Sequence, residues 1–181
     1  YELHNKFLEG TGSLVLDREN RIAYACISNR TNQILLIEWC ANMKFKPCFF
    51  TAKDSGKHVY HTNVVMSVCQ DMVFVCLDCI TNIIEKNELV KMIKSTHKQI
   101  IDISFSQMNS FLGNVLELKN KYGDSFLVMS STAFNTLSDS QKKIINKKNS
   151  ILHSPLHTIE YFGGGSARCM IAEIFLNPLT E

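Results

Sequence analysis

A cysteine near the end of the chain stands in a context suited to a nucleophile. Cys169 follows the run 163–165, which is three glycines, and precedes an apolar segment from Ile171, so we expect it where a strand begins. Glycines lack Cβ atoms, so this backbone can turn sharply and approach a ligand closely. Cysteine reacts as the thiolate, which a cation such as Arg168, His61 or a cationic substrate would favour. The alternative is a small buried hydrophobic residue, since free cysteine is often buried.

Three further polar residues precede the other predicted strand pairs at matched positions. Glu9 lies before the first pair, His61 before the second and Asn114 before the third. If the pairs belong to units arranged about an axis, the loops before them meet at one end of it. A carboxylate, an imidazole, an amide and the Cys169 thiol would then share one cavity. Taken singly, they are an exposed loop carboxylate, a strand-edge histidine and a turn residue, but their matched positions favour a site.

The elements that must position these residues repeat along the chain. Alternating and helically spaced apolar residues predict three units of strand, strand, helix and strand, with a period of roughly 50 residues. The units cover 9–53, 59–105 and 111–161, with a closing segment at 163–181. The predicted strands are 13–17, 22–27, 48–51, 63–68, 72–80, 100–105, 115–118, 125–130 and 158–161, and the predicted helices are 33–45, 85–97 and 132–148. Such units bury their apolar faces only against neighbours, so a ring is the simplest closure.

Composition and charge are those of a globular domain. The 181 residues are 45% hydrophobic with a formal charge of +2, so we expect no nucleic-acid partner. No apolar run reaches the roughly 20 residues of a membrane span, and no signal peptide opens the chain. The seven cysteines are predicted to be reduced, in a cytoplasmic protein. Cys76 and Cys79 are expected on one strand, facing opposite sides, so no metal site is predicted.

Five segments resemble the guanidine-modifying superfamily of arginine deiminases, dimethylarginine dimethylaminohydrolases and glycine amidinotransferases. They are EGTGSLVLDR (9–18), SNRTN (28–32), YHTN (60–63), FLGNVLEL (111–118) and GGGSARCMIAE (163–173). The similarity is closest to the amidinotransferase-like branch that includes citrulline-hydrolysing enzymes. It implies an α/β fold, the five-bladed α/β propeller called the pentein, with about three of the five blades in this chain. The resemblance therefore implies the C-terminal part of a single catalytic domain, inactive on its own.

The resemblance also implies roles for individual residues. Cys169 would attack the guanidinium or ureido carbon. His61 would protonate the departing nitrogen and then activate water, and Glu9 would hold the substrate N–H groups. Arg30 resembles the arginine that binds the substrate carboxylate in some members. The other expected substrate-binding residues are Asn63, Asn114, Gly165 and Arg168.

Two departures from the arginine deiminase pattern bear on the substrate. Those enzymes carry a carboxylate two residues after the histidine, where this chain has Asn63, and they read E-G-G-D where this chain reads E-G-T-G-S from Glu9. Less negative charge favours a neutral ureido group over a cationic guanidinium. We therefore predict a cysteine-dependent hydrolase that converts citrulline to ornithine through a covalent adduct, with no cofactor and no membrane partner. Arginine deimination, amidino transfer and a non-catalytic binding role are the alternatives, and homo-oligomerisation is left open.

Overall fold

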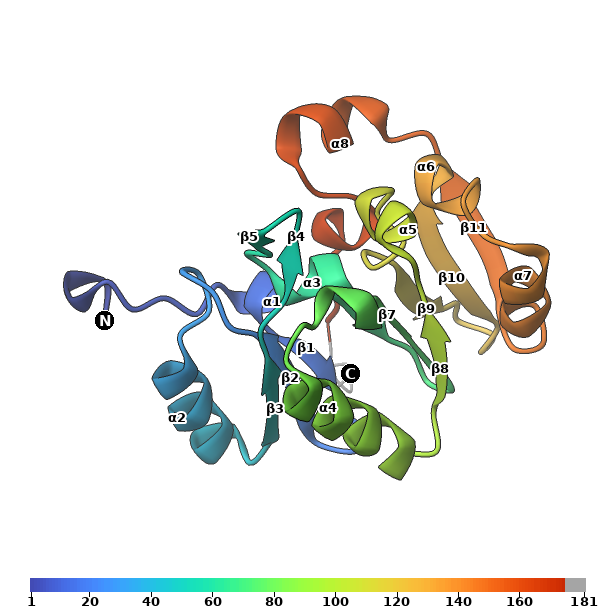
Figure 1. The fold of residues 1–181 in the computed structure, drawn as a ribbon. Coiled ribbons are helices and arrows are strands. Elements are labelled where there is room, and N and C mark those ends of the chain that lie inside the picture. The colour runs from blue at the N-terminus through green and yellow to red at the C-terminus, as the bar shows by residue number, and fades with distance from the viewer. Residues whose placement is uncertain (175–181) are drawn as a thin grey trace, which may run out of the picture.

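The computed structural model describes residues 1–174 and contains three successive three-stranded sheets (Figure 1). In each sheet the first two strands form an antiparallel pair, and the third lies parallel to the second. The strands are β1 (Val15–Asp17), β2 (Ile22–Cys26) and β3 (Lys46–Phe50); β6 (Met66–Val68), β7 (Met72–Val75) and β8 (Gln99–Asp102); and β9 (Leu116–Lys119), β10 (Ser125–Ser130) and β11 (Ser150–Ser154). The α/β class and the order strand, strand, helix, strand are therefore confirmed.

A parallel third strand requires a crossover, and helices supply it in each unit. These are α2 (Gln33–Met43), α4 (Ile83–Ser95), and the pair α6 (Ser131–Phe134) and α7 (Asp139–Ile145). Asn32 caps α2, because its side-chain oxygen accepts from the backbone N–H groups of Ile34 and Leu35 at 3.0 and 3.3 Å. Asn82 caps α4 in the same way.

Shorter elements connect the units. They are η1 (Glu2–His4), α1 (Gly10–Ser13), the hairpin β4 (Lys53–Asp54) and β5 (Lys57–His58), α3 (Thr62–Val65), η2 (Leu77–Cys79), α5 (Phe105–Asn109), α8 (His157–Gly163) and η3 (Ala167–Met170). None of the described helices is long and apolar enough to cross a membrane.

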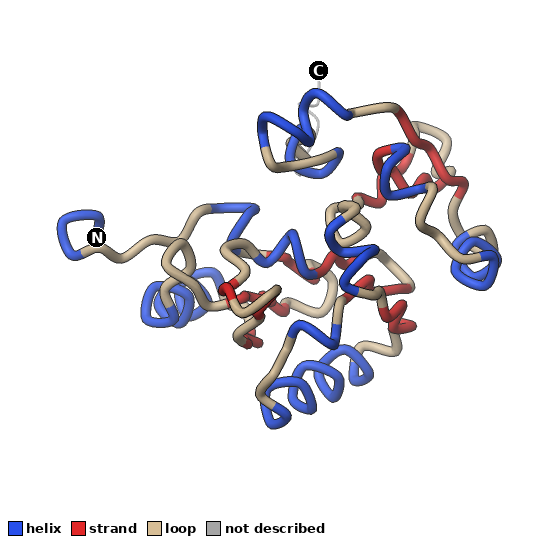
Figure 2. The backbone as a smooth tube through the Cα atoms, turned by 45° about the horizontal axis from the view of Figure 1, so that its top comes forward, coloured by secondary structure: helices blue, strands red, loops and turns tan. Residues whose placement is uncertain are grey.

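The three units are arranged side by side about a common centre. Strand β1 contacts β6, and β6 contacts β9, so the first strands of the units adjoin one another. The helices α2, α4 and α7 lie towards the outside of this arrangement (Figures 1 and 2). Among the described residues the sheets remain separate and do not close on themselves, so the five-bladed ring stays a prediction.

Most of the apolar side chains form one core that runs through all three units. Its fully buried members include Tyr24, Phe50, Phe74, Met108 and Leu127. A second, smaller cluster lies between the first sheet and α2 and contains Leu14, Ala23, Ala25, Leu36, Cys40 and Phe45. Because the large core joins residues from every unit, the relative positions of the loops between units are fixed by packing.

Several predicted elements differ in the structure. The segment predicted as the last strand of the third unit, 158–161, is part of α8, and β11 is the parallel strand instead. The predicted helix 132–148 is interrupted, because Ser138 forms a capping box with Gln141 and starts α7 anew. The predicted strand 63–68 begins as the helical turn α3, and 100–105 ends where Ser104 caps α5.

The region around the two neighbouring cysteines also differs from the prediction. Strand β7 ends at Val75, and Cys79 lies in the 3-10 turn η2, so the two cysteines are not on one continuous strand. The Cys79 thiol donates to the backbone oxygen of Cys76 at 2.9 Å, and both residues are fully buried. They are therefore packing residues of the main core.

Candidate functional site

The glycine-rich segment presents Cys169 at the surface, but on a turn and not at the start of a strand. Helix α8 ends at Gly163 and is capped by Gly164, whose φ of +65° is the left-handed conformation that glycine adopts at helix ends. Cys169 follows in η3, and residues 171–174 form no strand. A Cβ at Gly165 would lie 3.0 Å from the Cys169 sulfur, so this glycine leaves room for the thiol. The other six cysteines are buried, whereas Cys169 is exposed.

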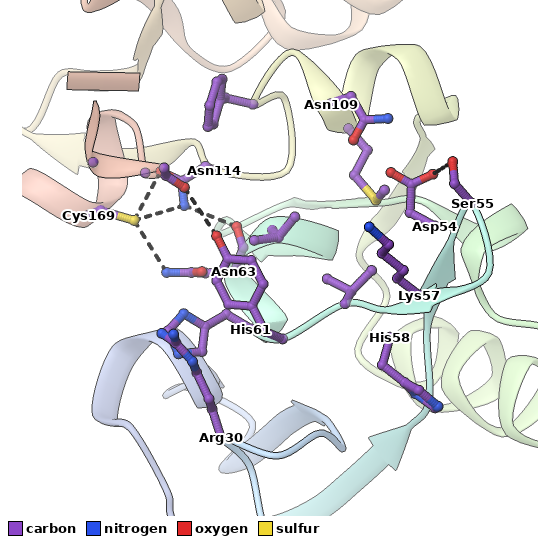
Figure 3. A pocket seen from close by; sticks show the side chains of 18 residues that line it. Arg30, Asp54, Ser55, Lys57, His58, His61, Asn63, Asn109, Asn114 and Cys169 are labelled. Atoms are coloured by element: carbon purple, nitrogen blue, oxygen red, sulfur yellow. Dashed lines mark hydrogen bonds between the residues drawn. The ribbon is translucent and has the colours of Figure 1, made fainter. Parts of the chain in front are cut away.

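Two buried amides face the sulfur. The side-chain nitrogens of Asn114 and Asn63 lie 3.2 and 3.6 Å from the Cys169 Sγ. Asn114 is held in turn, since it donates to the Asn63 backbone oxygen at 3.0 Å and its Oδ1 accepts from the Ser166 backbone N–H at 3.2 Å. Amide donors around a sulfur stabilise its negative form, so this arrangement suits a thiolate. Both predicted amide residues therefore lie beside Cys169 (Figure 3).

A histidine, a carboxylate and an arginine form a second group. The His61 Nε2 lies 2.7 Å from the Glu9 Oε2, and an Arg30 nitrogen lies 3.6 Å from the same oxygen. His61 begins α3 and Glu9 precedes α1, so each residue comes from the loop before the first strand of its unit. The carboxylate thus orients the imidazole, a pairing that also favours proton transfer by histidine.

A glycine and a tyrosine fix the position of His61. A Cβ at Gly12 would lie 2.8 to 2.9 Å from three atoms of the His61 ring, so the ring occupies the space that any other residue would fill. The Tyr60 ring packs beside His61 with centroids 4.9 Å apart, and the Arg30 guanidinium lies 5.2 Å from the centre of the Tyr60 ring. The Tyr60 hydroxyl also donates to the Gly164 backbone oxygen at 3.2 Å.

These groups share a cavity of about 740 Å³. Its lining includes Arg30, Tyr60, His61, Asn63, Asn114, Gly165 and Cys169. Figure 3 shows Cys169 and the two amides on one side of the cavity and residues of the β4–β5 hairpin, including Asp54 and Lys57, on the other. Such a volume is typical of small-molecule sites. Seven of the eight predicted site residues thus lie in or directly beside this cavity, with Glu9 reached through His61.

Arg168 is placed differently from the prediction. Its side chain lines a separate cavity with Asp17, Lys98 and Glu117, and it does not line the Cys169 cavity. Burial lowers the pKa of its guanidinium, and its Nε has no hydrogen-bond partner among the described residues. Consecutive residues of a 3-10 turn point about 120° apart, so Arg168 and Cys169 face different cavities. The geometry therefore does not support a contact between Arg168 and a ligand at Cys169.

Three features of the site were not predicted. Gly12 was visible in the sequence as the second glycine of EGTG, and Tyr60 as the residue before the histidine, but neither carried a sign of its contact with His61. The hairpin was also missed, because its strands are two residues long and its tip, Ser55 and Gly56, is the only signal.

The fold and the site define a class of protein, which comparison with known proteins confirms. The chain belongs to the pentein-fold, guanidino-group-modifying superfamily, and within it to the family described as N,N dimethylarginine dimethylhydrolase, eukaryotic, which matches residues 1–176. The family match confirms the superfamily predicted from the sequence. No curated protein sequence matches the chain.

Solved structures show the same fold at low sequence identity. ArgZ, an arginine dihydrolase from cyanobacteria, is 16% identical over 93% of this chain, which covers 25% of ArgZ, with a TM-score of 0.72. Its N-terminal domain bound to product is 17% identical over 90% of this chain and 54% of that domain, with a TM-score of 0.70. AgrE in complex with L-arginine is 18% identical over 90% of this chain and 22% of AgrE, also with a TM-score of 0.70. The chain thus spans about a quarter of ArgZ and half of its N-terminal domain.

Proposed function

We propose that the chain carries the nucleophile and the acid–base group of a cysteine-dependent hydrolase acting on the guanidino or ureido carbon of an arginine-like amino acid. One observation carries the proposal: the exposed Cys169 sulfur receives two buried amide donors and lines the same cavity as His61, which is paired with Glu9. A binding protein has no need for a thiol beside an oriented imidazole. The family and the similar structures support a hydrolase acting on guanidino groups.

The first half of the reaction forms a covalent adduct. The Cys169 thiolate attacks the planar carbon of the substrate, and a carbon–sulfur bond forms. The bond from that carbon to the departing nitrogen breaks as His61 donates a proton to this nitrogen. Glu9 holds the imidazole in position through its 2.7 Å contact. With citrulline as the substrate, ornithine leaves and a carbamoyl group remains on the sulfur.

The second half releases the adduct. His61, now neutral, removes a proton from water, and the resulting hydroxide attacks the carbon bound to sulfur. The carbon–sulfur bond breaks and the thiolate returns to its place beside the amides of Asn63 and Asn114. With a carbamoyl adduct the product is carbamate, which decomposes to ammonia and carbon dioxide.

The charges around the cavity favour citrulline. The Glu9 carboxylate already contacts Arg30 at 3.6 Å and the His61 ring at 2.7 Å. Among the described lining residues, Asp54 is the one carboxylate, whereas Arg30 and Lys57 are cations. Asn63 adds no charge beside the sulfur. A neutral ureido group with a carboxylate at the far end therefore suits this cavity, and Arg30 would exchange its 3.6 Å contact with Glu9 for that carboxylate.

Arginine or a methylated arginine is the second candidate, and the comparisons favour it. The matching family is named for dimethylarginine, and the similar structures include an arginine dihydrolase and a complex with L-arginine. Attack on arginine would expel ammonia and, after hydrolysis, leave citrulline. The two candidates are therefore compatible as successive reactions at the same carbon.

Product analysis with the intact protein separates these candidates. The protein is incubated separately with citrulline, arginine and asymmetric dimethylarginine, and products are identified by mass spectrometry beside a Cys169→Ala control. We expect ornithine from citrulline, and a loss of at least about 10³-fold in the control, because the variant has no nucleophile. Citrulline from arginine or dimethylarginine would instead establish the guanidino substrate.

Alkylation separates an enzyme from a binding protein independently of the substrate. Cys169 is the one exposed cysteine of seven, so mild iodoacetamide treatment reports on it selectively. An activated thiolate reacts much faster than a free thiol at neutral pH. Slow alkylation together with no product from any of the three substrates would refute the enzymatic proposal.

A further inference from the structure

A buried carboxylate lies behind the glycine-rich turn, outside the cavity that holds Cys169. Glu160, on α8, is 8% exposed and does not line that cavity. Its Oε1 accepts from the Ser166 hydroxyl at 2.8 Å, and its Oε2 accepts from the Thr132 hydroxyl at 2.7 Å. Burial acts to raise the pKa of Glu160, but hydrogen bonds from Ser130, Thr132 and Ser166 outweigh it, so the pKa lies below the ordinary 4.5. The charged form is therefore stabilised mainly by hydroxyl donors, with a smaller contribution from His157 of the same helix.

The hydrogen bonds continue from Glu160 to the cysteine. Ser166 is fully buried, and while its hydroxyl is bound to Glu160 its backbone N–H donates to the Asn114 Oδ1 at 3.2 Å. The Asn114 Nδ2 in turn lies 3.2 Å from the Cys169 Sγ. Glu160 thus links Thr132 of α6, through Ser166 and Asn114, to the sulfur. Each of the linking groups is buried, so water cannot replace a lost partner cheaply.

This arrangement discriminates between the thiol and the thiolate. The Cys169 sulfur has two contacts with Asn114: Nδ2 at 3.2 Å, which donates to a thiolate, and Oδ1 at 3.5 Å, which accepts from a thiol. The Ser166 N–H already occupies Oδ1, and it prevents the amide from rotating by half a turn. The amide nitrogen therefore stays directed at the sulfur, and the contact that suits the thiolate is the shorter one.

We propose that Glu160 is a positioning residue for Cys169: by anchoring Ser166, it fixes the orientation of the Asn114 amide and so keeps the sulfur in its reactive, negatively charged form. The proposal rests on the proposed role of Cys169 as the nucleophile. Glu160 itself does not touch the substrate. Its effect is on the reactivity of the thiol, which alkylation measures without any substrate.

The test compares Glu160→Gln with Glu85→Gln in the intact protein. Glu85 is a matched control, because its carboxylate also accepts a threonine hydroxyl, that of Thr51 at 2.8 Å, and it does not line the Cys169 cavity. Iodoacetamide alkylation of Cys169 is followed across the pH range, with Cys169→Ser as the blank. For Glu160→Gln we expect the alkylation rate at pH 7 to fall about tenfold, and the increase of this rate with pH to begin at higher pH. Glu85→Gln should have the same alkylation profile as the unchanged protein.

A second variant keeps the test decisive if Glu160→Gln fails to fold. Ser166→Ala removes the hydroxyl bound to Glu160 but keeps the backbone N–H that holds Asn114, so we expect a smaller fall of about threefold. In the double variant the two effects should not add, because both remove the same link. Unfolding is monitored for every variant, so that rates are compared between folded proteins.

Equal alkylation profiles for Glu160→Gln and Glu85→Gln would overturn the positioning role. If Glu160→Gln does not fold, an unchanged alkylation profile for Ser166→Ala would overturn it instead. A slower, shifted profile in a protein that turns over none of the three substrates would support the positioning role while the proposed function fails. The two proposals are therefore tested separately.

Discussion

The first strands of the three units, β1, β6 and β9, have a cavity at each end. The two cavities differ in whether their charged groups face the cavity or pair with each other inside the protein. At the cysteine end, around Cys169 and His61, charged and polar groups face a space open to a ligand. At the lysine end, Lys98 and Asp17 are paired with each other within the protein. The same three strands therefore border a candidate reactive site at one end and a buried ion pair at the other.

Lys98 and Asp17 form a buried pair at the lysine end. The side chains of Lys98 and Asp17 are 4% and 1% exposed, with their charged atoms 3.5 Å apart. Lys98 also donates to the backbone oxygens of Cys69 and Gln70 at 3.0 and 2.6 Å, and Asp17 accepts from Asn20. This contact joins the end of β1 in the first unit to the second unit. Buried charges with complete partners hold units together, whereas those left facing a cavity are available for chemistry.

Replacing Lys98 should have the largest effect on the stability of the fold. Lys98→Met leaves Asp17 buried without its cation, so we expect the free energy of unfolding to fall by about 3–5 kcal/mol. In the protein that remains folded, alkylation of Cys169 should be unchanged. Chemical denaturation and alkylation of the same preparation check both parts. A large loss of Cys169 reactivity in folded Lys98→Met would show that the two ends are not independent.

Gly12→Ala, in contrast to Lys98→Met, should affect the reaction more than the stability of the fold. The new Cβ would lie 2.8 Å from the His61 ring, so the imidazole must move away from Glu9. We expect kcat/KM to fall by about 10- to 100-fold, because a misplaced acid–base group loses most of its contribution. Gly163→Ala is the comparison variant, because Gly163 also lines the Cys169 cavity but its Cβ would meet only Ile159 at 3.9 Å and its φ is not positive. Equal activities for the two alanine variants would contradict the packing of His61 against Gly12.

Acidification should change the stability of the protein less than the substitutions above, through two carboxylates, Glu117 and Glu160. Glu117 faces the lysine end, and its pKa is below 4.5 because hydrogen bonds from Ser125, Gln70 and Asn149 outweigh its burial. Glu160 has the same direction of shift. A lowered folded-state pKa adds stability that is complete above about 4.5 and is lost as the pH falls through the folded value.

Glu117→Gln and Glu160→Gln should therefore change stability in the same way but differ in their effect on the alkylation of Cys169. Each should be less stable than the unchanged protein at pH 7, and the difference should shrink as the pH falls below about 4.5. Only Glu160→Gln should also slow the alkylation of Cys169. Denaturation at several pH values provides the measurement. A stability difference that stays constant down to pH 3 would contradict the stated pKa directions.

The matched positions of the polar residues were the most informative part of the sequence. Glu9, His61 and Asn114 each precede the first strand of a unit, and the structure brings His61 and Asn114 to one cavity and Glu9 against His61. The strand, strand, helix, strand order was also predictable, because apolar periodicity reports burial on one face. Resemblance to a known superfamily supplied the fold and the roles proposed for these residues.

Other features depend on contacts that periodicity does not encode. The segment 158–161 has a strand-like composition, yet it lies in α8, where Glu160 bonds to Thr132 and Ser166. Sequence adjacency suggested that Arg168 and Cys169 share a site, but the turn η3 directs them to different cavities. The contact of Gly12 with His61 joins residues 49 positions apart, and only the packed structure reveals it.

Because β1, β6 and β9 adjoin one another, substitutions between the units would affect the site without affecting the individual units. Glu9, His61 and Asn114 belong to three different units, so the distances among them depend on contacts between faces that are far apart in the sequence. A substitution on one of those faces that tilts a unit slightly would abolish the proposed turnover while every helix and sheet remains intact. Such variants would be classified as catalytic lesions by assay and as native by circular dichroism, although they touch no reacting group.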